Sequence, residues 1–213
     1  YFGLSVSLFG TLAYSVIPAN TSREMLVQLN QTYMGLLLTG ILILVYGQFL
    51  LEWESSYFEA LLSRPMELRS YLEAKLLILW SFGLVSYTAC LPSLYFGHEI
   101  LLRHSLLLLY NLGINAPLLL FLSGYSRRKL DLNQMFLSNQ GKGALQFLVV
   151  LPTFLLPTLL MLMLHLSGRG EAGIHFLGLL GILALFLTPF SLRLVERQIR
   201  LQKHALVEAF RKA

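Results

Sequence analysis

Charged residues are scarce in this chain of 213 residues, where Asp, Glu, Lys and Arg together make up only 13%. A soluble domain normally carries about 25% charged residues. A soluble chain this short also could not hide its 56% of hydrophobic residues from water. The single cysteine, Cys90, lies inside an apolar run, which excludes a disulfide framework. The composition therefore indicates that most of the chain is surrounded by lipid.

Patterns of catalytic and metal-binding residues are also missing. None of the five histidines has H-x-x-x-H spacing or a neighbouring cysteine, and G-x-S-x-G and H-E-x-x-H do not occur. The string at 140–143 lacks the complete phosphate-loop pattern. We therefore expect no enzyme, no metal site and no cofactor. The apolar runs hold almost no ionisable residues, which argues against an ion-coupled transporter or a proton pump.

Six apolar runs divide the chain, and each has close to the roughly 20 residues that cross a bilayer as a helix. A barrel would show alternating segments of about 10 residues instead. We predict an all-α, polytopic transmembrane bundle over residues 1–192 and a separate amphipathic helix over 193–213. Because the first run starts at Tyr1 without a methionine, we expect the intact protein to be longer. The six predicted spans are 1–17, 32–51, 72–96, 105–125, 145–166 and 174–192.

Basic residues lie almost entirely on one side of the predicted spans. Thirteen of the 16 Lys and Arg fall in alternate loops and the C-terminal tail, and only Arg23, Arg103 and Arg169 fall on the other side. Positively charged loops face the cytoplasm. We therefore predict that both ends of the chain are cytoplasmic. The thirteen residues on the basic side are Arg64, Arg69, Lys75, Arg127, Arg128, Lys129, Lys142, Arg193, Arg197, Arg200, Lys203, Arg211 and Lys212.

The first long cytoplasmic segment, residues 52–71, reads EWESSYFEALLSRPMELRSY. Its apolar residues share one helical face, and Pro65 ends that helix. A helix that only lies on lipid would be mostly basic, whereas four glutamates here outnumber two arginines. The mixed charge favours a docking helix for a cytoplasmic motor, with an ordinary interfacial helix as the alternative. The candidate docking residues are Glu54, Tyr57, Phe58, Leu61 and Arg64.

Two further features leave alternatives open. Asn111 and Asn115, four residues apart on the most polar predicted span, either line a pathway or bond a neighbouring helix. The tail carries apolar residues at helical spacing and one ion pair, Glu196 with Arg200. It either lies on the membrane or contacts a partner.

A family resemblance adds to these observations. The string EWESSYFEALLSRPMELRSYLEAK resembles the coupling segment of ABC-2 type exporter permeases, in which a short helix, a proline turn and a lysine join the second and third spans. Here these would be residues 55–63, Pro65 and Lys75. The strings RKLDLNQMFLSNQGKGALQFLVVLPTFLLP and HALVEAFRKA resemble a Bacteroidetes family of unnamed ABC-2-like permeases, the domain-of-unknown-function group 5687, over most of the chain. The chain would be the second half of such a protein.

The resemblance implies a permease subunit of an ATP-driven exporter in the bacterial inner membrane, with the type V exporter-like architecture. A separate cytoplasmic ATPase would dock on residues 52–69, and the transmembrane halves would form a dimer or pseudo-dimer. The chain itself would bind membrane lipid but no nucleotide and no nucleic acid. The alternatives are a non-transporting scaffold of an envelope complex and a membrane-embedded lipid enzyme. The enzyme would need a polar cluster at one membrane face, and the sequence shows no convincing one.

Overall fold

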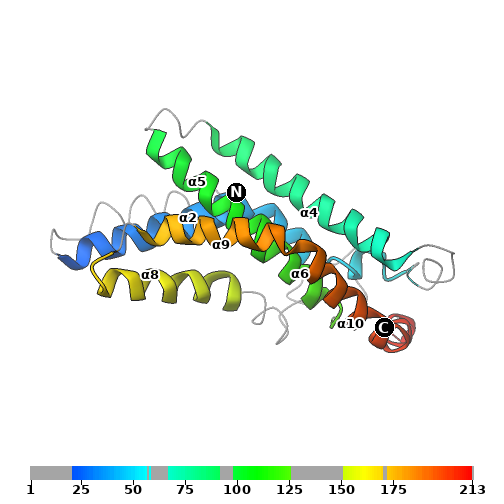
Figure 1. The fold of residues 1–213 in the computed structure, drawn as a ribbon. Helices are drawn as coiled ribbons and strands as arrows, with labels where there is room; N and C mark the ends of the chain where they lie inside the picture. Colours follow the sequence, from blue (N-terminus) through cyan, green and yellow to red (C-terminus); the bar gives the residue numbers. More distant parts are fainter. Residues whose placement is uncertain are drawn as a thin grey trace.

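A computed structural model describes residues 21–56, 58, 67–91, 98–125, 151–169 and 172–212, and these are helical without any strand (Figure 1). The helices run back and forth along one elongated bundle. In chain order the elements are α2 (Thr21–Gly47), the 3₁₀ turn η1 (Glu52–Glu54), α4 (Leu68–Cys90), α5 (His98–Tyr110), the π-helix η3 (Asn111–Asn115), α6 (Ala116–Ser123), the π-helix η4 (Leu151–Leu155), α8 (Leu156–Leu166), α9 (Ala172–Phe186) and α10 (Thr188–Lys212).

Each of the two π-helices comes directly before a helix that has proline in its first turn. Pro117 is the second residue of α6, which follows η3, and Pro157 is the second residue of α8, which follows η4. Proline has no N–H to donate, and its ring clashes with the carbonyl four residues earlier. The wider π turn gives that carbonyl room, so the helix continues past the proline. Residues 98–123 therefore form one continuous helical rod.

Close packing between the helices depends on glycine. A Cβ added at Gly113 of η3 would overlap the backbone carbonyl of Gly181 in α9, and one added at Gly181 would overlap the backbone at Leu109. Between α2 and α5, a Cβ at Gly35 would overlap the Leu107 side chain. Small residues at such crossings let membrane helices approach closely and gain van der Waals contact.

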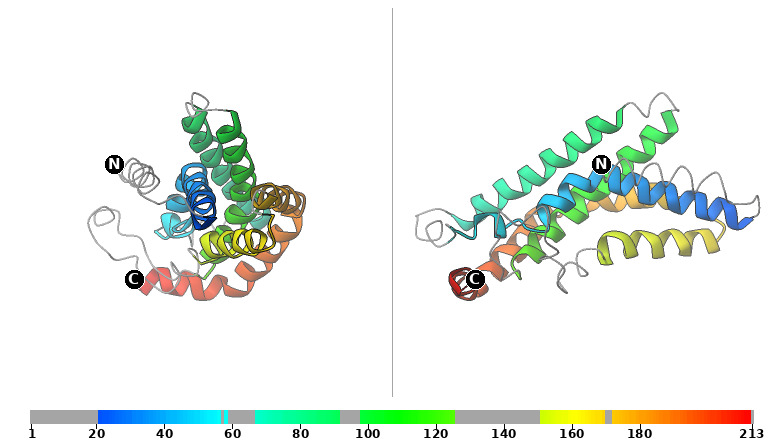
Figure 2. Two further views of the ribbon diagram at one scale, coloured as in Figure 1. Left: turned by 90° about the vertical axis from the view of Figure 1, so that its left-hand side faces the viewer. Right: turned by 180° about the vertical axis from the view of Figure 1, so that it is seen from behind.

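α9 and α10 do not form one straight helix, since their axes meet at 64° around Leu187. Pro189 cannot donate to the carbonyl four residues earlier, which weakens the helix at this point. The Thr188 hydroxyl lies 3.4 Å from the carbonyl oxygen of Ala184, one residue before the carbonyl that loses its donor. Figure 2 shows α10 turning away from the direction of α9 and crossing beside the bundle. The tail helix therefore begins at Thr188, before the predicted boundary at residue 193.

Three of the described helices are long and apolar enough to cross a membrane: Gln28–Glu54, Leu68–Cys90 and His98–Ser123. They correspond to the second, third and fourth predicted spans, although α2 already begins at Thr21. The bent pair α9–α10 counts as a fourth if it is one span, and Thr153–Leu166 is shorter. Residues 1–17, the predicted first span, lie outside the described residues. Six spans are therefore not confirmed.

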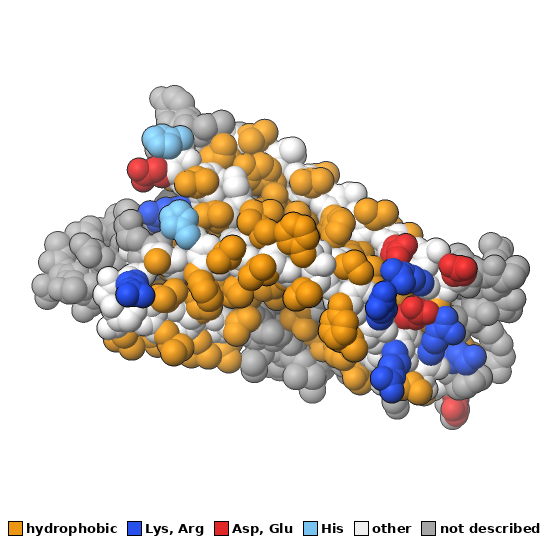
Figure 3. All heavy atoms as spheres, in the orientation of Figure 1, with side chains coloured by type: hydrophobic (Ala, Val, Ile, Leu, Met, Phe, Trp, Pro, Cys, Tyr) orange, Lys and Arg blue, Asp and Glu red, His pale blue; other side chains and the backbone are white. Residues whose placement is uncertain are grey.

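The surface agrees with a membrane environment. Large apolar side chains are exposed along the middle of the bundle, for example Leu77, Val85 and Leu179, each more than half exposed. Figure 3 shows this apolar belt between two polar ends. We name the end that holds η1, the start of α4 and most of α10 the charged end. The other, where α5 begins with His98 and Glu99 and where Arg169 follows α8, is the opposite end.

Candidate functional site

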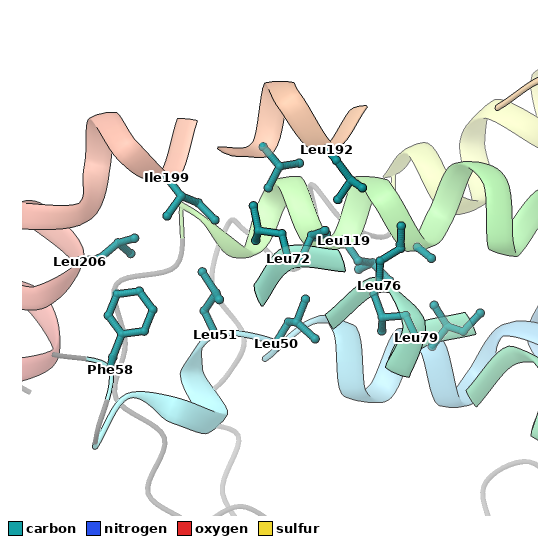
Figure 4. Packing of buried hydrophobic residues seen from close by; sticks show 14 residues of the cluster. Leu50, Leu51, Phe58, Leu72, Leu76, Leu79, Leu119, Leu192, Ile199 and Leu206 are labelled. Carbon is teal, nitrogen blue, oxygen red and sulfur yellow. The ribbon is translucent and has the colours of Figure 1, made fainter. Parts of the chain in front are cut away.

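The charged end contains the larger of two buried apolar clusters (Figure 4). Leu50 and Leu51, which follow α2, are fully buried there together with Leu72 of α4. Phe58 is 2% exposed and lies next to Leu206 of α10 in the same cluster (Figure 4). The segment after α2 is thus packed against both α4 and α10, rather than standing away from the bundle.

A buried ion pair fixes this segment to α4. Lys75 Nζ lies 2.5 Å from Glu54 Oε1, and the two side chains are only 5% and 15% exposed. The Tyr71 hydroxyl donates to the other carboxylate oxygen of Glu54. Lys75 also lies over the Tyr71 ring, 5.5 Å from its centroid. Because both Glu54 oxygens and the ammonium have partners, the charges are tolerated inside the bundle.

The structure places two of the five predicted docking residues inside the molecule. Glu54 is in the ion pair, and Phe58 is in the apolar cluster. Both side chains therefore attach the segment to the helices beneath it and do not face outward. Tyr57, Leu61 and Arg64 lie outside the described residues, so their role as docking residues stays a prediction.

Sequence reasoning missed the partner of Glu54. We treated Lys75 as one of the basic residues that mark the cytoplasmic side, but its ammonium is buried and paired. Tyr71 and Lys75 are four residues apart, and so lie on one face of α4. That spacing, with a lysine inside an apolar run, was the available signal for a buried acidic partner.

The second polar group lies in the middle of the bundle, where η3 crosses α2. Asn111 is 1% exposed and donates to the Leu36 carbonyl at 3.0 Å and to the Thr39 hydroxyl at 2.9 Å. Thr39 in turn donates to the Gly35 carbonyl at 2.7 Å. Asn111 therefore links two helices, as in the helix-bonding alternative proposed from the sequence.

Asn115 completes this group from the same face of the rod. Its amide nitrogen lies 2.6 Å from the Asn111 side-chain oxygen, and the residue is fully buried. Its own side-chain oxygen has no hydrogen-bond partner among the described residues. On the other side of η3, the Trp80 indole donates to the Leu112 carbonyl at 3.0 Å. The π-helix is thus bonded to α2 and to α4.

No group of three or more His, Cys, Asp and Glu suited to a metal ion occurs within the described ranges. The two polar groups described above are one ion pair at an end and one amide–hydroxyl chain at mid-depth, and further polar contacts, such as Tyr87 with Ser105 at 2.7 Å, also join helices of the bundle. Hydrogen bonds and ion pairs of this kind fix helices relative to one another.

A family of unknown function, DUF5687, matches residues 4–213. The chain belongs to this family. No curated protein and no solved structure matches it. The residues that match this family include all the helices described above. The Glu54–Lys75 ion pair and the Asn111–Thr39 chain therefore both lie within the family's domain.

Proposed function

We propose that this DUF5687 chain is the transmembrane permease subunit of an ATP-driven exporter of the ABC-2 type. A separate cytoplasmic ATPase docks on the charged end, and its ATP-dependent closure moves the helices. The protein works in a bacterial inner membrane with the charged end in the cytoplasm. Two transmembrane halves form a dimer or pseudo-dimer, and the chain itself binds no nucleotide.

The observation that supports this proposal best is the clamped segment at the charged end. The Glu54–Lys75 pair ties η1 to α4, and Phe58 packs in the same cluster as Leu206 of α10. A protein that pushes on this segment therefore pushes on two helices at once. The resemblance of the same segment to the coupling region of ABC-2 permeases, and the three long apolar helices, agree with this role.

The test is co-purification with an ABC ATPase encoded beside this gene, with and without ATP. Charge substitutions at Tyr57→Asp and Leu61→Asp should abolish the complex, because a charge in an apolar docking contact is desolvated without a partner. Phe58 is not suited to this test, since it is buried and its substitution would disturb the fold. Arg169→Glu, a charge change at the opposite end, is the control and should leave the ATPase bound.

Size-exclusion elution and helical content of each variant separate lost docking from lost folding. If the double variant keeps its fold and still binds the ATPase fully, residues 57–61 are not the docking site. A second candidate function, a non-transporting scaffold of an envelope complex, predicts stable partners whose binding does not depend on nucleotide. Pull-downs that give the same partners in ATP, in ADP and without nucleotide would favour the scaffold.

A further inference from the structure

α10 has two apolar sides. One side packs against the bundle, and the other is exposed on the surface of the protein. Leu192, Val195 and Ile199 point into the charged-end cluster and are at most 6% exposed. A second apolar stripe faces away from the protein. Its members in α10 are Phe190, Leu194 and Leu201, which are 46% to 77% exposed and are four and seven residues apart; Phe186 and Leu187, before the bend, are exposed as well.

Three arginines lie on the exposed side of α10, with Arg197 between Leu194 and Leu201 on the apolar stripe and Arg193 and Arg200 beside it. Arg193, Arg197 and Arg200, spaced by four and three residues, line an open hollow of about 400 Å³ together with Glu196 and Leu201. Arg200 pairs with Glu196 at 2.7 Å, whereas Arg193 and Arg197 have no ion pair within the part of the chain that the structure describes. The hollow therefore carries a net positive charge.

The position of α10 decides what this surface meets. The stripe begins at Phe186, the last residue of α9, and continues from Leu183 of the apolar belt. The 64° bend then turns α10 away from the direction of α9, at the edge of the apolar belt and next to the charged end. A helix in that position buries apolar side chains just below the lipid headgroups, while arginines extend to the phosphates.

We propose that the outward side of α10 binds the surface of an anionic phospholipid bilayer. The apolar stripe enters the boundary between headgroups and acyl chains, and Arg193 and Arg197 contact the lipid phosphates. Because the arginines are positively charged, we expect anionic lipid to bind more tightly than neutral lipid. Because the exposed apolar side chains continue the apolar belt at Phe186, we expect lipid to cover them rather than a protein in the aqueous phase. The binding does not depend on the proposed transport function.

The experiment measures the depth of a nitroxide label on residue 201 of the full chain, in a Leu201→Cys, Cys90→Ala background. The protein is placed in nanodiscs of phosphatidylcholine with or without phosphatidylglycerol, and collisions with oxygen and with a water-soluble nickel chelate are compared. Phosphatidylglycerol should move the label from the chelate-accessible to the oxygen-accessible range. High salt should reverse part of this shift by screening.

Arg193→Gln with Arg197→Gln should weaken the response to phosphatidylglycerol by about fivefold for each charge removed. Arg193→Lys with Arg197→Lys keeps the charge and should keep the response, as should Arg169→Gln at the opposite end. A label that stays accessible to the chelate in both kinds of disc would overturn the proposal. The outward side of α10 would then be a candidate surface for a protein partner instead. Spin–spin coupling between two labels would also overturn it, by placing a second copy there.

Discussion

Lys75 and Glu54 carry opposite charges into the bundle at a point where neither has much access to water. Removing both charges from water has a large cost, which their mutual attraction offsets only when the geometry is good. The Tyr71 hydroxyl satisfies the second carboxylate oxygen and improves that balance. Breaking such a pair from one side leaves an uncompensated buried charge.

We therefore predict that Lys75→Met lowers the free energy of unfolding by about 3 kcal/mol. The double variant Glu54→Gln, Lys75→Met should recover much of this loss, because neither charge then remains. The measurement is denaturant or thermal unfolding of the purified protein in detergent. Arg69→Ala removes an exposed pair with Glu73 on the same helix and should leave the midpoint almost unchanged. Equal losses in Lys75→Met and Arg69→Ala would contradict the structural assignment of the pair.

Asn111 gives a second prediction at the scale of single residues. Asn111→Ala removes two hydrogen bonds to α2 and the acceptor of the Asn115 amide. Bonds of this kind between membrane helices contribute about 1 kcal/mol each. We expect a loss of about 2 kcal/mol in unfolding free energy, measured as above. Ser81→Ala, which removes an exposed bond within α4, is the control and should have almost no effect. Similar midpoints for the two variants would exclude a helix-linking role for Asn111.

At the scale of elements, the rod formed by α5, η3 and α6 organises the molecule. Its π turn bonds to α2 through Asn111 and to α4 through the Leu112 carbonyl, and it touches α9 at Gly113. A π turn before a proline is a place where a helix changes its hydrogen-bond pattern at low cost. The same arrangement at η4 and Pro157 precedes α8, so two helices of the bundle share this construction.

The contact between Gly113 and Gly181 predicts a position where even one methyl group is not tolerated. Gly113→Ala would push against backbone, which cannot move aside, so α9 would have to separate from the rod. We expect a loss of about 2 kcal/mol or more from overpacking. Gly178→Ala meets only the Leu106 side chain, which is able to rotate, and should cost less. Thermal unfolding of both variants shows which one loses more stability. If Gly178→Ala were the less stable variant, the backbone contact at Gly113 would not be the tighter of the two.

At the scale of the whole molecule, the bundle has an apolar belt and two polar ends of different character. The charged end holds Glu54, Arg69 and the arginines of α10, whereas the opposite end holds histidines and few cations. Because basic segments stay on the cytoplasmic side of a membrane, this difference sets the expected orientation.

The orientation is tested with single cysteines in a Cys90→Ala background and a maleimide that does not cross membranes. Ser56→Cys at the charged end should react in inverted vesicles only, since that end is expected to face the cytoplasm. Arg169→Cys at the opposite end should react in intact spheroplasts only. Denatured samples provide the control for total reactivity. Labelling of both positions from the same side would contradict a bundle that crosses the membrane between them.

The sequence alone determined the helical class, the membrane environment and the separation of charge between the two ends. These follow from composition and from the length of apolar runs, which act over consecutive residues and need no knowledge of contacts. The position of the second to fourth spans was predictable for the same reason. Glu54, by contrast, was predicted as a docking residue on the cytoplasmic surface, because the mixed charge of residues 52–71 favoured a docking helix.

Only the tertiary structure placed Glu54 against Lys75, Asn111 against Thr39, and Gly113 against Gly181. These pairs are 21, 72 and 68 residues apart in sequence, so no local period reports them. The same holds for α10, whose two apolar stripes are both visible in the sequence. Which stripe is covered by the bundle and which remains outward depends on the 64° bend at Leu187 and on what α10 packs against.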